Sequence, residues 1–253
     1  MRFTMLGDTQ RNTHYEDKPN EDLFWFDEAR GAALVLDGVT RDRENGVYPN
    51  PSPSRVVTEV FAQTASRVLS AAPEGKTPEE RLAAAVKAGN AAVAEANTGF
   101  PSAFLPGTVG VLALVEGSAL HYAYVGDSNL LLLSKGTVKV FTEPQTRAVH
   151  SCRGKYTANE IRTQICNNAQ HPCGYGVWTG QEGAMDFLRM GVVPLEKGDR
   201  VLLCTDGIDA FLSATGPEAL CAMDSKTILE KAMSFLKPEG WMDDRSAIII
   251  DVE

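Results

Sequence analysis

The chain has 253 residues, of which 43% are hydrophobic and 23% are charged, and its formal net charge at pH 7 is −9. This composition is typical of a globular protein with a sizeable core, whereas the negative charge argues against a surface for nucleic acid or an anionic membrane, since both need a positive patch. No apolar run is long enough for a signal peptide or a membrane span, so we expect a cytoplasmic protein, and we expect it to be a monomer.

The first half of the chain predicts two strands followed by two long helices. Leu23–Asp27 and Ala32–Leu36 are apolar runs joined by a tight turn that ends in Gly31, and so short a connection joins antiparallel neighbours. Ser54–Ser70 carries apolar residues at helical spacing. A second helix begins Thr77-Pro78-Glu79-Glu80, which supplies an N-cap hydroxyl, a proline at the first helical position and a glutamate that can close a capping box, and it continues to about Ala96.

The second half alternates between apolar runs and turns. We expect strands at Val109–Val115, Leu120–Val125, Leu130–Leu133, Val138–Phe141, Phe187–Met190, Val201–Cys204 and Ala247–Val252, and weaker helices at Thr157–Cys166 and Ser225–Leu236. Helices segregated from antiparallel strands predict an α+β protein in which helices pack outside stacked sheets. Because we find no repeat and no linker, we expect one domain, residues 1–253.

The five cysteines contain no C-x-x-C pair and do not resemble a disulfide framework. Cys204 and Cys221 lie in apolar segments and are predicted to be core residues. The other three lie in a polar stretch with two histidines: Cys152, Cys166, Cys173, His150 and His171. Their spacing does not match the common zinc motifs, so zinc is the less favoured interpretation of this stretch.

Acidic residues recur where predicted strands meet loops. Asp37, Asp127 and Asp206 each follow an apolar run, whereas Asp22 and Asp243 each precede one. In an antiparallel sheet the end of one strand lies beside the beginning of its neighbour, so these five carboxylates can share one rim. A single Asp-Gly pair after a strand is common turn chemistry, and only the ordered set of five supports a functional prediction.

Several carboxylates at one rim repel one another unless cations compensate. Hard oxygen ligands of this kind suit Mg²⁺ or Mn²⁺. A pair of such ions about 3.5–4 Å apart is a standard device for hydrolysing phosphate esters. The sequence therefore predicts a metal-dependent phosphate-ester hydrolase. A nucleotide-binding glycine pattern around 107–117 and 126–128 is the alternative, and the predicted hairpins disfavour it.

The acidic motifs, in this order, resemble the type 2C serine/threonine phosphatases, a family of metal-dependent protein phosphatases. The matched segments are Asn-Glu-Asp (20–22), Val-Leu-Asp-Gly (35–38), Gly-Thr (107–108), Val-Gly-Asp-Ser (125–128), Cys-Thr-Asp-Gly (204–207) and Asp-Asp-Arg-Ser-Ala-Ile (243–248). The resemblance implies a divergent, bacterial-type member. Its fold would be a four-layer α/β/β/α sandwich of two mainly antiparallel sheets flanked by helix pairs, with a flap at about 142–183.

The resemblance also implies a role for each acidic residue. Asp37 would bridge two Mn²⁺ or Mg²⁺ ions, the carbonyl of Gly38 would complete the shell of one, and Asp206 and Asp243 would hold the other. Asp127, with Asp206, matches a position that binds a third metal in bacterial relatives. Asp22 would orient water beside the metals, so Asp22, Asp37 and Asp206 are the catalytic candidates. A metal-activated water would then attack phosphoserine or phosphothreonine in a phosphorylated protein substrate.

The sequence departs from the family at the expected phosphate contact. Asp17 stands where the family has an arginine, so we predict that Lys18, or next Arg41, binds the phosphate. This departure raises an alternative function: a catalytically weak or inactive module that binds phosphorylated partners. The flap region is either a solvated insertion or a substrate-recognition surface. We expect none of the four histidines to be catalytic, and His14 is the nearest candidate.

Overall fold

A computed structural model of the protein describes residues 1–39, 47–71, 75–152 and 154–253. Its named strands form two sheets, and all hydrogen-bonded neighbours run antiparallel. The first sheet has the order β1 (Phe3–Gln10), β10 (Arg245–Val252), β9 (Arg200–Cys204), β6 (Asn129–Ser134) and β7 (Thr137–Val140). The second has the order β2 (Leu23–Asp27), β3 (Ala32–Val39), β4 (Gly107–Glu116), β5 (Ala119–Val125) and β8 (Arg189–Pro194).

Strand β3 shows how the sequence builds the layers. Residues 32–36 are fully buried, because β3 lies inside its sheet and both of its faces are covered. Side chains alternate between the faces, so Leu34 and Leu36 pack toward the helices while Ala33 and Val35 pack toward the first sheet. A strand buried on both faces is a continuous apolar run, which is why Ala-Ala-Leu-Val-Leu was recognisable as a strand.

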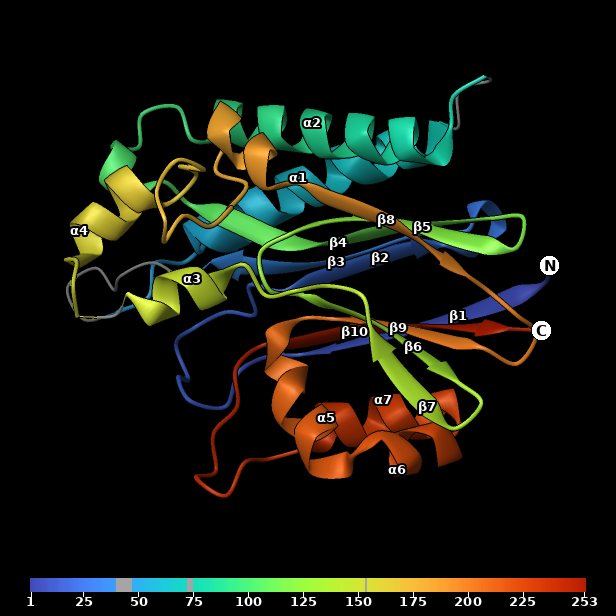
Figure 1. The fold of residues 1–253 in the computed structure, drawn as a ribbon. Helices are drawn as coiled ribbons and strands as arrows, with labels where there is room; N and C mark the ends of the chain where they lie inside the picture. The colour runs from blue at the N-terminus through green and yellow to red at the C-terminus, as the bar shows by residue number, and fades with distance from the viewer. Residues whose placement is uncertain (40–46, 72–74, 153) are drawn as a thin grey trace.

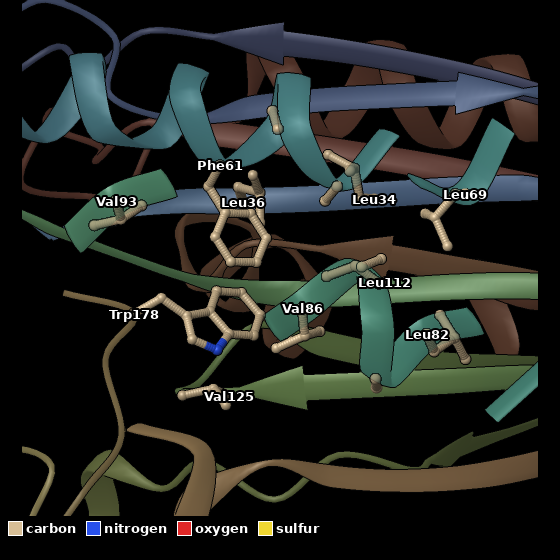
Figure 2. Packing of buried hydrophobic residues seen from close by; sticks show 14 of the residues in the cluster. Leu34, Leu36, Phe61, Leu69, Leu82, Val86, Val93, Leu112, Val125 and Trp178 are labelled. Atoms are coloured by element: carbon tan, nitrogen blue, oxygen red, sulfur yellow. The ribbon is translucent and has the colours of Figure 1, made fainter. Parts of the chain in front are cut away.

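Helices α1 (Pro53–Ala71) and α2 (Pro78–Ala96) cover the outer face of the second sheet (Figure 1). The Phe61 ring on α1 stacks on Trp178 with centroids 4.4 Å apart (Figure 2). Gly89 on α2 makes room for Phe61, since a Cβ there would lie 2.8 Å from the ring. The capping box predicted for α2 is confirmed: Glu80 N donates to Thr77 Oγ1 at 3.2 Å, and Thr77 N donates to the Glu80 carboxylate at 2.9 Å.

Three helices cover the outer face of the first sheet: α5 (Asp209–Thr215), α6 (Pro217–Ala222) and α7 (Ser225–Ser234). The order helices, sheet, sheet, helices is visible in Figure 1 and confirms the predicted α/β/β/α sandwich. The predicted helix pair on this side is a set of three, because the short α5 and α6 precede the predicted α7. None of the helices in the described ranges combines the length and apolar character needed to cross a membrane.

The region 142–183, which we call the insertion segment, contains helices α3 (Thr146–Ser151) and α4 (Ala158–Glu160), and α4 continues into a short π-helix, η3 (Ile161–Ile165). The short 3-10 helices are η1 (Glu28–Arg30), η2 (Ser102–Phe104), η4 (Glu182–Phe187) and η5 (Asp206–Ile208). A disulfide joins Cys152 to Cys173. The cysteine pattern did not predict this disulfide, and neither sulfur is free to bind zinc. Cys204 is buried as predicted, whereas Cys221 is only half-buried.

Two strand predictions were incomplete for physical reasons. Strand β1 was not predicted, because it lies at a sheet edge and most of its side chains are not buried, so it lacks a continuous apolar run. The predicted strand Phe187–Met190 was misplaced. Phe187 ends the turn η4 and is buried there, whereas β8 begins at Arg189 and is largely exposed. The apolar signal marked a buried turn residue and not the edge strand.

Candidate active site

Strands β3, β5 and β9 end at the side of the sandwich opposite the chain termini (Figure 1). Three aspartates at or just after these strand ends converge. Asp37 is near the end of β3, Asp127 follows β5, and Asp206 begins the turn that follows β9. One carboxylate oxygen of each lies within 4.8 Å of the others. Asp37 and Asp127 are half-buried, and Asp206 is exposed. The second sheet therefore supplies two carboxylates and the first sheet one, so the group exists only where the two sheets pack together.

A cleft of about 230 Å³ opens over these carboxylates. The strand ends and the segments before β2 and β10 supply part of its wall: Lys18, Asp37, Gly38, Val39, Val109, Asp127, Asp206 and Asp243. The insertion segment supplies the rest: Thr146, Tyr175, Gly176 and Val177. The structure therefore brings together around one cavity all five predicted metal-site residues. Lys18, the first candidate for the phosphate contact, lines the same cavity.

Three carboxylates of this cleft, Asp37, Asp127 and Asp206, have a raised pKa. Desolvation, followed by the charges of Asp22 and Asp206, raises the pKa of Asp37 well above its ordinary value. Asp206 opens onto the cleft, yet desolvation, followed by the charge of Asp127, raises its pKa to about 7. Desolvation likewise raises the pKa of Asp127. Burial is the largest cause for all three groups, and for Asp37 and Asp206 the negative charges of neighbouring carboxylates add to it.

Asp22 lies against the cluster from the segment before β2. Its side chain is buried, and Thr205 Oγ1 donates a hydrogen bond to Asp22 Oδ2 at 2.7 Å. Desolvation and then the charge of Asp244 raise the pKa of Asp22 well above its ordinary value. The threonine that precedes Asp206 therefore orients Asp22, and this contact explains why a hydroxyl stands at that point of the motif.

Lys18 lies among carboxylates at the edge of the cleft. Its Nζ is 2.6 Å from Asp244 Oδ2, 3.1 Å from Asp243 Oδ1 and 3.6 Å from Glu21 Oε2. Burial lowers the pKa of Lys18, but the charges of Asp243 and Asp244 more than offset this and raise it above its ordinary value. Lys18 is therefore a fixed positive charge that holds the Asp243-Asp244 pair in place.

The comparison with known families identifies this arrangement. A family model for protein phosphatase 2C matches residues 9–245 of the chain. The chain belongs to the protein phosphatase 2C family. The matched range includes all six motifs on which the resemblance was based except the last three residues of the sixth.

Solved structures share the fold of this protein phosphatase 2C member. The serine/threonine phosphatase PstP/Ppp of Mycobacterium tuberculosis matches with 22% identity and a TM-score of 0.69 over 100% of both chains. A PstP catalytic domain in complex with two manganese ions matches with 22% identity and a TM-score of 0.67 over 99% of both chains. Stp1 of Staphylococcus aureus matches with 16% identity and a TM-score of 0.68 over 100% of this chain and 96% of its own. Comparison with curated protein sequences finds no match.

Close backbone packing explains both Asp-Gly pairs of this protein phosphatase 2C chain. Gly38 lies inside β3, and a Cβ there would be 2.7 Å from both the Cβ and the carbonyl oxygen of Glu21. A Cβ at Gly207 would be 1.9 Å from the carbonyl oxygen of Asp244. Glycine at these positions lets the acidic segments approach each other, so the interpretation of these pairs as simple turn chemistry does not account for them. Thr108 Oγ1 also donates to the carbonyl oxygen of Asp37 at 2.8 Å.

The insertion segment contributes residues that sequence reasoning missed. Gly126 N donates to Gln145 Oε1 at 3.1 Å, and Gln145 N donates to the Gly126 carbonyl at 3.0 Å, so α3 begins beside Asp127. Desolvation has the largest effect on the pKa of Asp127, whereas a hydrogen bond with the Thr146 side chain and, more weakly, the charge of His150 lower it, so both α3 residues lie close to Asp127. No spacing in the sequence signals this, because 23 residues separate His150 from Asp127 and only the packing of α3 brings them together.

Three other predicted residues, His14, Arg41 and Asp243, lie outside the tight group of aspartates or outside the described residues. His14 lies in a hollow beside the cleft and not among the residues that line the cleft. Arg41, the second phosphate-binding candidate, lies outside the described residues. Asp243 lines the cleft but is outside the tight group of three carboxylates, and its Oδ1 accepts hydrogen bonds from Lys18 Nζ and from Asp244 N at 2.9 Å.

Proposed function

We propose that this protein is a Mn²⁺- or Mg²⁺-dependent phosphatase that hydrolyses phosphoserine and phosphothreonine in proteins. The observation that carries the proposal is the convergence of Asp37, Asp127 and Asp206, with carboxylate oxygens within 4.8 Å of one another, at the floor of an open cleft. Membership of the protein phosphatase 2C family supports the reaction class. The solved PstP catalytic domain, which is in complex with two manganese ions, supports the type and number of ions.

The residues of the cleft fit divalent metal ions. All three converging groups are hard oxygen donors. Neighbouring carboxylates help to raise the pKa of Asp37 and of Asp206, and bound cations would relieve that repulsion. We propose that Asp37, the Gly38 carbonyl, Asp206 and Asp243 hold two ions, and that Asp127 with Asp206 holds a third. When bound, such ions supply positive charge to the phosphate oxygens and lower the pKa of a water.

The protein itself positions these groups. Thr205 orients Asp22, Thr108 holds the backbone of Asp37, and Lys18 holds Asp243 through its ion pairs. Lys18 also lines the cleft, so it stays our first candidate for the phosphate contact, with Arg41 next. Because a charge-assisted hydrogen bond to phosphate is strong, either cation would orient the substrate for attack.

The alternative function is a catalytically weak or inactive module that binds phosphorylated partners. The observation in its favour is that Lys18 is already paired with three carboxylates and Asp17 stands where the family has an arginine. Both features weaken the grip on phosphate without removing any of the converging aspartates.

A phosphate-release assay tests the proposal. Purified protein with Mn²⁺ is given a phosphothreonine peptide, and the same assay is run with EDTA. We expect Mn²⁺-dependent release that Asp37→Asn abolishes and Asp206→Asn lowers by at least about a hundredfold. Asp251→Asn is the matched control, because Asp251 lies at the opposite end of β10 from Asp243. Peptide binding without release would instead support the module.

A further inference from the structure

A second hollow adjoins the cleft and is lined by aromatic rings. It has a volume of about 150 Å³ and is formed by Asn12, His14, Tyr15, Lys18, Tyr48, Trp241, Met242 and Asp243. Lys18 and Asp243 line both cavities, so the hollow and the cleft share one wall. A peptide whose phosphorylated residue occupies the cleft would therefore place a neighbouring side chain at this hollow, since consecutive residues of an extended chain are only about 3.3 Å apart.

We call the four rings His14, Tyr15, Tyr48 and Trp241 the aromatic subsite. The His14 ring lies 4.0 Å from the Tyr15 ring and 5.1 Å from the Trp241 ring, and the Tyr15 and Tyr48 rings lie 5.5 Å apart. Unlike the rings of the core, these keep accessible surface: Tyr15 is 37% exposed and Trp241 is 39% exposed. Clustered exposed aromatic side chains beside a binding cleft are typical of a recognition surface.

The backbone beneath the aromatic subsite is already fixed. Thr13 N donates to the Met242 carbonyl at 3.0 Å, and Met242 N donates to Thr13 Oγ1 at 2.8 Å, so the N-terminal and C-terminal segments are tied reciprocally. Tyr15 N donates to Asn12 Oδ1 at 2.8 Å, and Asn12 N donates to Asp244 Oδ1 at 2.6 Å. Met242 is fully buried below them. A ligand that binds here orders little additional backbone, which favours affinity.

The chemistry of the walls selects for an uncharged ring. Aromatic-lined grooves bind proline-containing segments, and aromatic pairs gain stability beyond their buried area. A basic side chain is disfavoured, because Lys237 Nζ already lies 4.5 Å from the centre of the Trp241 ring. The one carboxylate among the lining residues, Asp243, is already paired with Lys18 at 3.1 Å. A volume of about 150 Å³ holds a single side chain and not a longer segment.

We infer that the aromatic subsite binds a proline or aromatic ring of a residue close to the phosphorylated serine or threonine in the substrate protein. The inference rests on the proposed function, because it deepens the substrate class of the same site. His14 then takes part in substrate selection and not in proton transfer. Trp241 and Tyr15 become the residues that determine specificity.

Selectivity between peptides tests the inference. Phosphothreonine peptides that carry proline, phenylalanine or alanine at each of the two positions on either side are compared by kcat/KM. We expect the best ring-containing peptide to exceed its alanine counterpart by about tenfold, which corresponds to about 1.4 kcal/mol. The ratio should fall toward one in Trp241→Ala and should be largely kept in Trp241→Phe. Phe100→Ala, which removes a ring that is 42% exposed outside the hollow, is the matched control and should keep the ratio.

Peptide binding, measured by fluorescence anisotropy on the same proteins, separates this inference from the proposed function. If no peptide is dephosphorylated but the ring peptides bind more tightly than the alanine peptides, the proposed catalysis is wrong and the subsite is supported. If the alanine peptides are dephosphorylated and no ring is preferred in either assay, the subsite is wrong and the catalysis is supported. A preference that persists unchanged in Trp241→Ala, with a melting temperature equal to wild type, would also overturn the subsite.

Discussion

Replacement of Lys18 by methionine tests whether a buried cation organises the acidic motifs. Lys18→Met keeps a long apolar side chain and removes the ammonium group that contacts Asp244, Asp243 and Glu21 at 2.6, 3.1 and 3.6 Å. The Lys18 side chain is 6% exposed and that of Asp244 is 3% exposed, so water cannot replace the lost partner. The variant leaves the buried Asp244 carboxylate without its ion pair to Lys18.

The expected cost follows from this burial. Removing one partner of a buried ion pair costs about 3–5 kcal/mol. Asp244 keeps hydrogen bonds from Asn12 N at 2.6 Å and Glu21 N at 3.1 Å, which places the expectation near the lower limit. For a chain of this size, a loss of about 3 kcal/mol lowers the melting temperature by roughly 6–12 °C.

Urea unfolding at pH 7.5 without metal measures the loss. The pH is within the window in which Lys18 contributes fully. Although burial lowers its pKa, the charges of Asp243 and Asp244 raise the folded-state value above the ordinary 10.5, so the contribution is complete below 10.5 and disappears only as the pH rises through the folded value. Lys135→Met is the matched control, because the Lys135–Glu196 pair is exposed and should contribute little.

A double variant tests the mechanism. Lys18→Met combined with Asp244→Asn removes the charge that the single variant leaves unpaired, so we expect the double variant to recover more than half of the lost stability. The reasoning is refuted if Lys18→Met costs no more than Lys135→Met, or if the second substitution adds to the loss. Either result would mean that Lys18 does not hold the Asp243-Asp244 pair.

Three further predictions concern the metal cluster, the packing of an acidic segment and the core. The Asp206 carboxyl group has a folded-state pKa of about 7, above its ordinary 3.8, so the folded metal-free protein binds a proton more tightly than the unfolded chain and its melting temperature in EDTA should fall as the pH rises between these values. Mn²⁺ at pH 7 should reverse the fall, and a rise in EDTA would contradict the assignment. Gly38→Ala places a Cβ 2.7 Å from Glu21 and should cost about 1–3 kcal/mol in urea unfolding, with a parallel loss of phosphatase activity. Phe61→Ala removes the ring that stacks on Trp178 and should cost about 3–5 kcal/mol while Mn²⁺-dependent activity per folded molecule is kept; an unchanged unfolding midpoint would contradict the packing shown in Figure 2.

The layers of the fold could be predicted from the sequence because most of the core elements carry local signals. The run 32–36 shows a strand buried on both faces, and Thr77 with Glu80 shows where α2 begins. Exposed and short elements were harder to predict from the sequence. The edge strands β1 and β8 expose much of their surface, so their apolar pattern is weak, and the short helices α5 and α6 contribute few buried residues each.

The sequence alone determined that acidic residues stand at strand ends, and the rule that antiparallel strands place ends beside beginnings was enough to predict a shared rim. Only the tertiary structure decided which of these acidic residues converge and which lie at the edge of the cleft. Asp37, Asp127 and Asp206 converge, whereas Asp243 is held by Lys18 at the edge of the cleft. The nearness of His150 to Asp127 depends on how α3 packs, and the aromatic subsite depends on contacts between segments far apart in the chain, such as that of His14 with Trp241. Local patterns report which face of an element is buried, but contacts across 200 residues depend on how the two sheets and their loops pack, and that information is not local.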